Sequence, residues 1–333
     1  MNPPVSRLRW GVLSTAKIGR TAVIPAIQRS DHGTVVAIAS RNGAAARVVA
    51  DELGIPDAFG SYEELLAADD IDAIYNPLPN HLHAEWTMKA ADAGKHVLCE
   101  KPLTLDATEA RRVIAHCEAA GAVLQEAFMY RFHPQWLRAK QLVDEGRIGE
   151  LRAVQAWFSY FNDDAANIRN IAEYGGGALM DIGCYPISVA RWLFGSEPDD
   201  VQAITDCDPT SGVDILTSAM MRFGTAQATF TVSTRTEPYQ RVHIVGTTGR
   251  IEVEIPFNAP NDRPTRIFVT AGGSPPTDPA TEIEEFPATD QYTLQADAFA
   301  LAIREAQTAA LPPSDALANM AVIDAVRAAG GGR

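Results

Sequence analysis

A glutamate, a lysine and a proline, Glu100-Lys101-Pro102, directly follow the apolar residues 97–99, and no turn residue separates them. The apolar residues have the composition of a short buried strand. A lysine at the end of such a strand is partly desolvated, which lowers the pKa of its ammonium group toward the range useful for proton transfer. Pro102 has a fixed φ angle, which stiffens the backbone at Lys101, and the Lys101–Pro102 bond could be cis. Lys101 is therefore a candidate catalytic residue, although the same residues could form a surface Glu–Lys pair before a helix.

A second set of reactive side chains follows three consecutive glycines at residues 175–177. Asp181 and Tyr185 are four residues apart, which places them on one face of the helix predicted within residues 175–194. A carboxylate and a phenol one turn apart suit sugar binding and proton transfer, although such a pair is also a common surface hydrogen bond. Tyr160 and Arg169 precede this helix as further candidate substrate contacts, and Arg169 could equally form a surface salt bridge.

A tight turn at residues 14–19 has the spacing of the dinucleotide-binding fingerprint G-x-G-x-x-G, of which only Gly19 is kept. Ser14 and Ala16 stand at the first two glycine positions. Their small side chains still let the backbone approach a pyrophosphate at a helix N-terminus. An ordinary strand–helix turn could look the same, but the position after a first strand favours a nucleotide site. The predicted cofactor-binding residues here are Ser14, Thr15, Ala16, Ile18 and Gly19.

The second predicted strand, residues 35–39, ends at Ser40 and Arg41. An NAD site usually carries an acidic residue at this point, which bonds the ribose hydroxyls. A hydroxyl and a guanidinium would instead bind a 2′-phosphate, which an acid would repel. We therefore expect NADP as the cofactor in preference to NAD, unless Arg41 merely lies on a solvated surface.

The strand at residues 72–75 leads into a loop with two prolines, where a cofactor should pass. Asn80 can cap the helix that follows, and that role alone would explain it. His81 and His83 do not have a zinc-ligand spacing, so we expect no metal site. The predicted cofactor-binding residues of this region are Pro77, Leu78, Asn80 and His83, together with Glu100 and Lys101.

The first 126 residues alternate predicted strands with predicted helices. The strands are residues 8–13, 35–39, 72–75, 97–99 and 123–126, and the helices are 18–29, 44–53, 83–93 and 106–119. Ser61 has the capping-box spacing to Glu64, and Gly54 lies where a helix-terminating glycine is expected. This alternation predicts an α/β domain with a doubly wound parallel sheet, whose ligands bind beyond the carboxyl ends of the strands.

Residues 127–333 follow a different pattern, which predicts an α+β domain. A helix is expected at 132–146, a strand at 151–161 and a helix within 175–194. Strand-like runs that alternate in polarity then recur at 201–205, 215–223, 226–233, 241–245, 250–255 and 266–270, before two helices at 291–307 and 314–329. Such runs predict a large, mostly antiparallel open sheet with one face covered. Dimerisation is one way to cover the other face.

Composition limits the class of protein. The chain has 333 residues, enough for two domains, and its formal charge of -14 argues against nucleic acid or an anionic membrane surface as a partner. No apolar run approaches the roughly 20 residues of a membrane helix, and the N-terminus has no secretory signal pattern. The four cysteines are widely spaced. A reducing, cytoplasmic location is therefore expected.

Several of these stretches together resemble the Gfo/Idh/MocA oxidoreductases, in order and spacing over nearly the whole chain. They are Glu100-Lys101-Pro102, residues 14–19, Pro79-Asn80-His81, residues 128–134 and residues 175–185. Residues 175–185 are typical of the branch that holds NADP-dependent D-xylose dehydrogenases, dihydrodiol dehydrogenases and nucleotide-sugar ketoreductases. The resemblance implies a Rossmann domain at residues 1–126 and a substrate-binding and oligomerisation domain at 127–333, in a homodimer or homotetramer formed through the C-terminal sheet.

The resemblance also implies site residues. It places a nicotinamide over the C-terminal sheet, makes Lys101 an essential catalytic residue and puts Asp181 and Tyr185 in the substrate site. Many members of the family carry histidine where Tyr185 stands. In the xylose and dihydrodiol branch the tyrosine is taken as the acid/base.

The expected function is hydride transfer between NADP and a carbinol or carbonyl carbon of a sugar or cyclic diol. Tyr185 would accept the hydroxyl proton while Lys101 stabilises the developing alkoxide, or the two roles could be exchanged. Asp181 would bond a second substrate hydroxyl or hold Lys101. The alternatives are a nicotinamide-assisted glycosidase and a nucleotide-binding sensor without catalysis.

Overall fold

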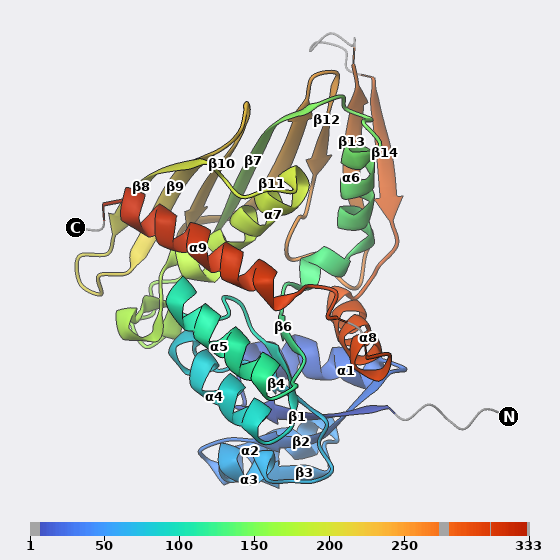
Figure 1. Cartoon of the computed structure of the whole chain (residues 1–333), viewed down its shortest axis with the longest axis vertical. Helices are drawn as coiled ribbons and strands as arrows, with labels where there is room; N and C mark the ends of the chain where they lie inside the picture. Colours follow the sequence, from blue (N-terminus) through green and yellow to red (C-terminus); the bar gives the residue numbers. More distant parts are fainter. Residues whose placement is uncertain (1–6, 273–279, 307, 332–333) are drawn as a thin grey trace, which may run out of the picture. The chain divides into compact units, whose positions relative to one another are not determined.

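The computed structural model describes residues 7–272, 280–306 and 308–331, which form two compact units (Figure 1). The first unit contains the described residues up to Met129 together with Tyr292–Leu317. The second contains Tyr130–Gln291 and the described residues from Ala318 onward.

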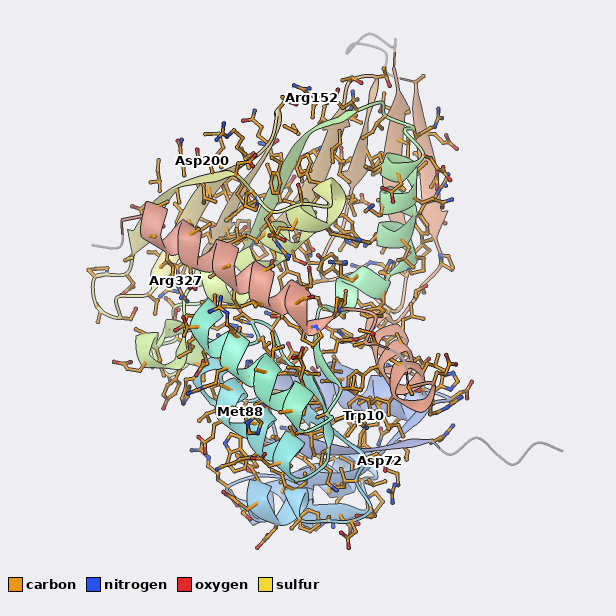
Figure 2. All side chains as sticks on the ribbon, in the orientation of Figure 1. Trp10, Asp72, Met88, Arg152, Asp200 and Arg327 are labelled. Carbon is orange, nitrogen blue, oxygen red and sulfur yellow. The ribbon has the colours of Figure 1, made fainter. Side chains whose placement is uncertain are left out.

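The sequence-based boundary at residue 126 assigns both C-terminal helices to the second domain. In the structure, these helices are divided between the two units. Almost all of α8 (Gln291–Arg304) belongs to the first unit. The ring of Phe299 packs on that of Trp10, a residue labelled in Figure 2, with 5.3 Å between the ring centroids. Thr293 also donates a hydrogen bond to the carbonyl of Ala26. The amphipathic pattern predicts such a helix but not the surface on which it packs. The predicted end of the helix, residue 307, lies outside the described residues.

The first unit is built on a six-stranded sheet in which every pair is parallel, as predicted. The strand order is β3-β2-β1-β4-β5-β6, so the order reverses between β1 and β4. In sheets of this kind, that reversal marks the ligand-binding crevice. The strands are β1 (Leu8–Leu13), β2 (Gly33–Ala39), β3 (Asp57–Phe59), β4 (Ala73–Asn76), β5 (His96–Cys99) and β6 (Leu124–Glu126).

Apolar cores lie on both faces of this sheet because successive side chains of a strand point to opposite sides. Val12 and Tyr75 belong to one core, while their neighbours Leu13 and Ile74 belong to the other. The helices of this unit besides α8 are α1 (Ile24–Arg29), α2 (Gly43–Leu53), α3 (Tyr62–Leu66), α4 (Asn80–Asp92) and α5 (Ala107–Ala119).

Local capping fixes where several of these helices begin and end. The Ser61 side chain accepts a hydrogen bond from the backbone of Glu64, as its spacing predicts. Gly54 ends α2 in the left-handed region, with φ of 66°, which a glycine adopts at no steric cost. Asp106 caps α5 in the same manner as Ser61 caps α3. The predicted cap at Asn80 is wrong, because Asn80 is the first residue of α4 and the cap position is Pro79.

The second unit is built on an eight-stranded sheet with the order β14-β13-β12-β11-β7-β10-β9-β8. All pairs are antiparallel except β7 with β10, which confirms the predicted, mostly antiparallel sheet. Helices α6 (Pro134–Asp144) and α7 (Cys184–Phe194) pack on one face (Figure 1). Helix α9 (Pro313–Ala329) ends the described chain. The strands are β7 (Leu151–Phe161), β8 (Asp200–Cys207), β9 (Asp214–Phe223), β10 (Ala226–Ser233), β11 (Arg235–Gly246), β12 (Gly249–Val253), β13 (Thr265–Ala271) and β14 (Thr281–Phe286).

Two strands, β3 and β14, are absent from the sequence-based assignment. Strand β3 has only three residues. Strand β14 is rich in glutamate, which is depleted in strands generally. Its pairing is supported by basic partners, since Arg266 lies opposite Glu285 in the register and Arg138 forms a bidentate ion pair with Glu284. Tertiary contacts therefore override the local preference.

Among the helices of the described residues, none is long and apolar enough to cross a membrane. In the same part of the chain, no three or more His, Cys, Asp or Glu side chains are grouped so as to hold a metal ion.

His133 gives the fold a predictable response to acid. It is fully buried and caps α6 by accepting a hydrogen bond from the backbone of Gln135. Burial lowers the pKa of His133 to about 4, from an ordinary value near 6.5. Between these two values the unfolded chain binds a proton that the folded chain does not, so His133 reduces stability as the pH falls from 6.5 to 4.

We therefore expect His133→Asn to weaken the pH dependence of the unfolding free energy between pH 6.5 and 4. The expected decrease is up to one proton, or about 1.4 kcal/mol per pH unit, measured by urea unfolding at several pH values. His133→Ala removes the same titration but also the cap, so it should have the same slope and about 1 kcal/mol less stability at pH 7. A slope that stays at the wild-type value in both variants would contradict this account.

Candidate active site

The turn after β1 keeps the backbone shape of a dinucleotide-binding loop without its first glycine. Ser14 has a φ of 71°, in the left-handed region that non-glycine residues seldom adopt. Its hydroxyl accepts a hydrogen bond from the backbone of Ala16 at 3.2 Å, and its own amide donates to Ala39 at 2.8 Å. These two bonds offset the strain of the turn. The following backbone is helical from Lys17, so its first N–H groups are directed toward the turn.

This helical segment is not the continuous α-helix predicted for residues 18–29. It passes through a π-turn at Gly19–Val23 before α1 begins. Pro25 explains the interruption, because its ring has no N–H for the carbonyl of Thr21 and would clash with it in an α-helix. The sequence shows the proline, but the apolar spacing alone suggests a regular helix.

Ser40 and Arg41 lie beside this turn, because β1 pairs with β2 in a register that places Leu13 opposite Ala39. The hydroxyl of Ser40 accepts a hydrogen bond from the backbone of Asn42 at 3.2 Å. Arg41 is exposed, and its charge opposes the rise that burial causes in the pKa of Tyr62. A hydroxyl and an exposed guanidinium thus lie next to the turn that follows β1.

Lys101 lies at the carboxyl end of β5, in a loop held from several sides. The Glu100 carboxylate accepts hydrogen bonds from the Tyr75 hydroxyl at 2.7 Å and from the amide of Lys101 at 3.3 Å. The amide of Leu103 donates to buried Glu126 at 2.7 Å. The Lys101–Pro102 bond is cis. Lys101 itself is partly buried. The loop thus presents a lysine on a fixed backbone at the sheet edge where ligands bind.

The structure gives His83 a different contact from the predicted cofactor contact. Its side chain is buried, and its ring nitrogens lie 2.8 Å from the carbonyl of Pro102 and 2.7 Å from the carbonyl of Leu78. Both nitrogens are therefore directed at the protein backbone. Pro77 and Leu78 occupy the loop after β4, where the sequence places them.

In the second unit, three predicted substrate contacts come together. The Asp181 carboxylate accepts a hydrogen bond from the Tyr160 hydroxyl at 2.5 Å and pairs with Nε of Arg169 at 2.9 Å. Burial, followed by the negative charge of Asp181, raises the pKa of Tyr160 well above its ordinary value. Tyr160 therefore keeps its proton at neutral pH. The charge of Asp181 is compensated by Arg169, so this cluster offers no strong base.

The three glycines before this cluster allow very close packing. A Cβ atom on Gly176 would lie 2.5 Å from the carbonyl oxygen of Arg169, and one on Gly177 would collide with the carboxylate of Asp214. Asp214 accepts hydrogen bonds from the amide of Leu179 at 2.6 Å and from Thr217 at 3.1 Å. It thereby anchors the start of the segment that carries Asp181. Sequence reasoning missed Asp214, which looks like any polar residue at the start of a strand.

Asp181 and Tyr185 are joined by a second irregular helix. A π-turn at Leu179–Gly183 precedes α7, and Pro186 accounts for it as Pro25 accounts for the first. The regular four-residue spacing assumed for one helical face therefore does not describe this segment. Tyr185 is buried, and its ring packs against three aromatic rings with centroid distances of 5.1–5.8 Å, those of Tyr130, Phe158 and Phe257.

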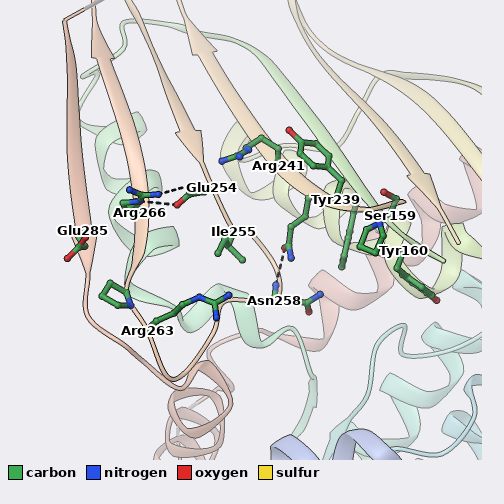
Figure 3. Close-up of a pocket in the computed structure, with 14 residues that line it drawn as sticks. Ser159, Tyr160, Tyr239, Arg241, Glu254, Ile255, Asn258, Arg263, Arg266 and Glu285 are labelled. Carbon is green, nitrogen blue, oxygen red and sulfur yellow. Dashed lines mark hydrogen bonds and ion pairs between the residues drawn. The ribbon is translucent and has the colours of Figure 1, made fainter. Parts of the chain in front are cut away.

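A separate hollow of about 710 Å³ lies on the second sheet (Figure 3). Arg266 forms a bidentate ion pair with Glu254 across it, at 2.8 and 3.0 Å. Tyr160 lies at its margin, but its lining includes neither Asp181 nor Tyr185. Through Tyr160, this hollow adjoins the cluster around Asp181.

Comparisons with known proteins match this architecture. Residues 8–128 match the model of an oxidoreductase family with an NAD-binding Rossmann fold, and residues 136–252 match that of the GFO/IDH/MocA C-terminal domain. A D-xylose 1-dehydrogenase (NADP(+)) of Haloferax volcanii is 44% identical over 96% of both chains. A trans-1,2-dihydrobenzene-1,2-diol dehydrogenase of Mus musculus is 31% identical over 74% of each.

A solved structure is also similar throughout. The 3-ketoreductase of Actinomadura kijaniata, in complex with NADP and TDP-benzene, superposes with a TM-score of 0.90 at 33% identity, covering 97% of this chain and 98% of that one. The matches therefore extend over both units. The chain belongs to the Gfo/Idh/MocA family of oxidoreductases, with an NAD(P)-binding Rossmann domain and the C-terminal domain of that family.

Proposed function

We propose that this oxidoreductase transfers a hydride between NADP and a carbinol or carbonyl carbon of a sugar or cyclic diol. The observation that carries the proposal is the loop after β5, which holds Lys101 at the sheet edge, one strand away from the reversal of strand order. The named activities of the xylose dehydrogenase, the diol dehydrogenase and the ketoreductase support the substrate class. When bound, NADP supplies the hydride acceptor.

Tyr185 and Lys101 are the groups left to handle the hydroxyl proton of the substrate. Asp181 is compensated by Arg169, and Tyr160 holds its proton against Asp181. The buried ring of Tyr185 is fixed by its aromatic neighbours, as a positioned proton acceptor must be. Lys101 would stabilise the alkoxide that develops on the same oxygen. Asp181, with Arg169 and Tyr160, would orient the other substrate hydroxyls.

We further propose that the outer face of the second sheet is covered by a second copy of the chain. Trp157, Ile204, Met220 and Tyr239 are exposed there by 40 to 75%. The register aligns Trp157 with Thr231, Thr231 with Ser218 and Ser218 with Ile204, so Trp157 and Ile204 lie in one row across four strands. A broad apolar sheet face is a typical homodimer surface.

The direct test is a panel of free aldoses, cyclic diols and glycosides with NADP or NAD, followed by absorbance of the reduced nicotinamide. We expect reduction of the nicotinamide with free sugars or diols.

Lys101→Met should lower turnover about 100-fold to 10,000-fold and leave the NADP dissociation constant nearly unchanged. Tyr185→Phe should also lower kcat and flatten the pH profile of kcat. Tyr160→Phe likewise removes a phenol but should neither lower kcat nor flatten its pH profile. Normal turnover in Lys101→Met would refute the catalytic role. A normal pH profile in Tyr185→Phe would assign the proton to Lys101.

Cofactor preference can be tested at Arg41. Arg41→Ala should weaken NADP binding by about 10-fold to 100-fold, since a charged hydrogen bond to phosphate contributes about 1.5–3 kcal/mol, and should leave NAD binding unchanged. Arg47→Ala is the matched control, because Arg47 lies on the next helix and pairs with Asp51. Titration calorimetry measures all four affinities. Equal losses for NADP and NAD in Arg41→Ala would argue against a 2′-phosphate contact.

Charge selectivity for the substrate can be tested at Asp181. Removing the carboxylate in Asp181→Asn removes the negative charge that pairs with Nε of Arg169. We expect the ratio of kcat/KM for D-glucuronate to that for D-glucose to rise about tenfold, because a substrate carboxylate can then pair with Arg169. Tyr160→Phe keeps both charges and should leave the ratio unchanged. An unchanged ratio in Asp181→Asn would place the Arg169–Asp181 pair away from the substrate.

A further inference from the structure

His83 connects two loops of the first unit through its ring. Nδ1 lies 2.8 Å from the carbonyl oxygen of Pro102, and Nε2 lies 2.7 Å from that of Leu78. The residue is 1% exposed. Carbonyl oxygens only accept hydrogen bonds, so each contact requires an N–H on the ring; a neutral imidazole has one and an imidazolium has two. No ring nitrogen is directed away from the backbone.

The two loops are neighbours at the edge where β4 and β5 end. These strands pair in a register that places Asn76 opposite Cys99, and the loops leave them directly afterward. The loop after β5 carries Lys101 immediately before Pro102. Asn76 adds to the connection, since its side chain accepts from the amide of Leu78 and donates to the carbonyl of His83, both at 3.3 Å. The position of Pro102 is therefore tied to α4 and to the β4 loop.

We propose that His83 is a positioning residue that places Lys101 for proton transfer through the contacts of its ring with the carbonyls of Pro102 and Leu78, one of which receives its N–H. It does so without contact to substrate or cofactor. The inference rests on the proposed function in one respect, that Lys101 acts in catalysis.

The charge state of the ring decides which replacement is conservative. Burial lowers the pKa of His83 to about 4, the two carbonyl contacts oppose this, and electrostatic interactions with Lys101 and His81 add to the lowering. The ring is thus mainly neutral at pH 7 and offers one N–H. Glutamine also offers an amide donor at similar reach, whereas leucine offers none. His83→Gln should therefore retain more of the function than His83→Leu.

Lys95 provides a matched control. Its ammonium group also bridges two backbone carbonyls, those of Ala68 at 2.7 Å and Ile71 at 2.8 Å, and it is also buried in the first unit. It precedes β5, at the end of the strand opposite to Lys101. Lys95→Met therefore removes a comparable two-carbonyl bridge without disturbing the Lys101 loop.

The first experiment compares kinetics and NADP affinity. We expect kcat to fall about 100-fold in His83→Leu and about tenfold in His83→Gln, with the NADP dissociation constant within threefold of wild type in both. Lys95→Met should lower the unfolding midpoint and leave kcat within twofold. Introducing His83→Leu into Lys101→Met should cause no further loss of kcat. A large rise in the NADP dissociation constant, an equal kcat loss in Lys95→Met, or an additive loss in the double variant would overturn the proposal.

A second measurement does not depend on activity. Hydrogen–deuterium exchange of the protein without added ligands should show faster exchange at residues 100–105 in His83→Leu, an intermediate rate in His83→Gln and the wild-type rate in Lys95→Met. Unchanged exchange at these residues in His83→Leu would refute the positioning role. If the wild-type protein oxidises nothing in the substrate panel, the proposed function fails, while the exchange result still decides whether His83 holds the loop.

Discussion

The parallel pairing of β4 with β1 and with β5 is the constraint on which the first unit's site depends. Because parallel strands end at the same edge, the turn at Ser14, the loop at Pro77 and Leu78 and the loop at Lys101 leave the sheet side by side. Buried polar side chains then fix the loops after β4 and β5. Tyr75 holds Glu100, Glu126 holds the amide of Leu103 and His83 holds Pro102 and Leu78.

The nucleotide turn and the segment that carries Asp181 share one irregularity of the backbone. In each unit a π-turn precedes a proline inside a helical segment, Pro25 in one and Pro186 in the other. The proline cannot donate a hydrogen bond to the preceding turn and would clash with it, so the backbone widens there. π-turns are frequent at functional sites, where they shift side chains from their α-helical positions. Here the two π-turns include Gly19 of the nucleotide turn and Asp181 of the second unit.

In the second unit, neighbouring groups stabilise the carboxylates of Asp181 and Asp214. Asp181 faces Arg169 and Tyr160, and Asp214 receives an amide and a hydroxyl at the start of the same segment. Burying a carboxylate is favourable only when such partners are present. The result is a polar cluster in which Arg169 balances the charge of Asp181, within a chain whose formal charge is -14. A cluster of this kind suits the orientation of a neutral, hydroxyl-rich ligand.

Sequence alone determined both sheets, most helices and the stretches that identify the family, because apolar periodicity and Gly, Pro and capping residues act locally. It also selected Tyr160, Arg169 and Asp181, which the fold brings together. Only the tertiary structure decided that α8 packs on Trp10, that Asp214 anchors the glycine turn and that His83 holds backbone carbonyls. Apart from the contact of His83 with Leu78, these contacts join residues from 19 to 289 positions apart, counted as Pro102 minus His83 and Phe299 minus Trp10. No local pattern encodes a partner at that distance, because the partner is set by packing and by the satisfaction of buried polar groups.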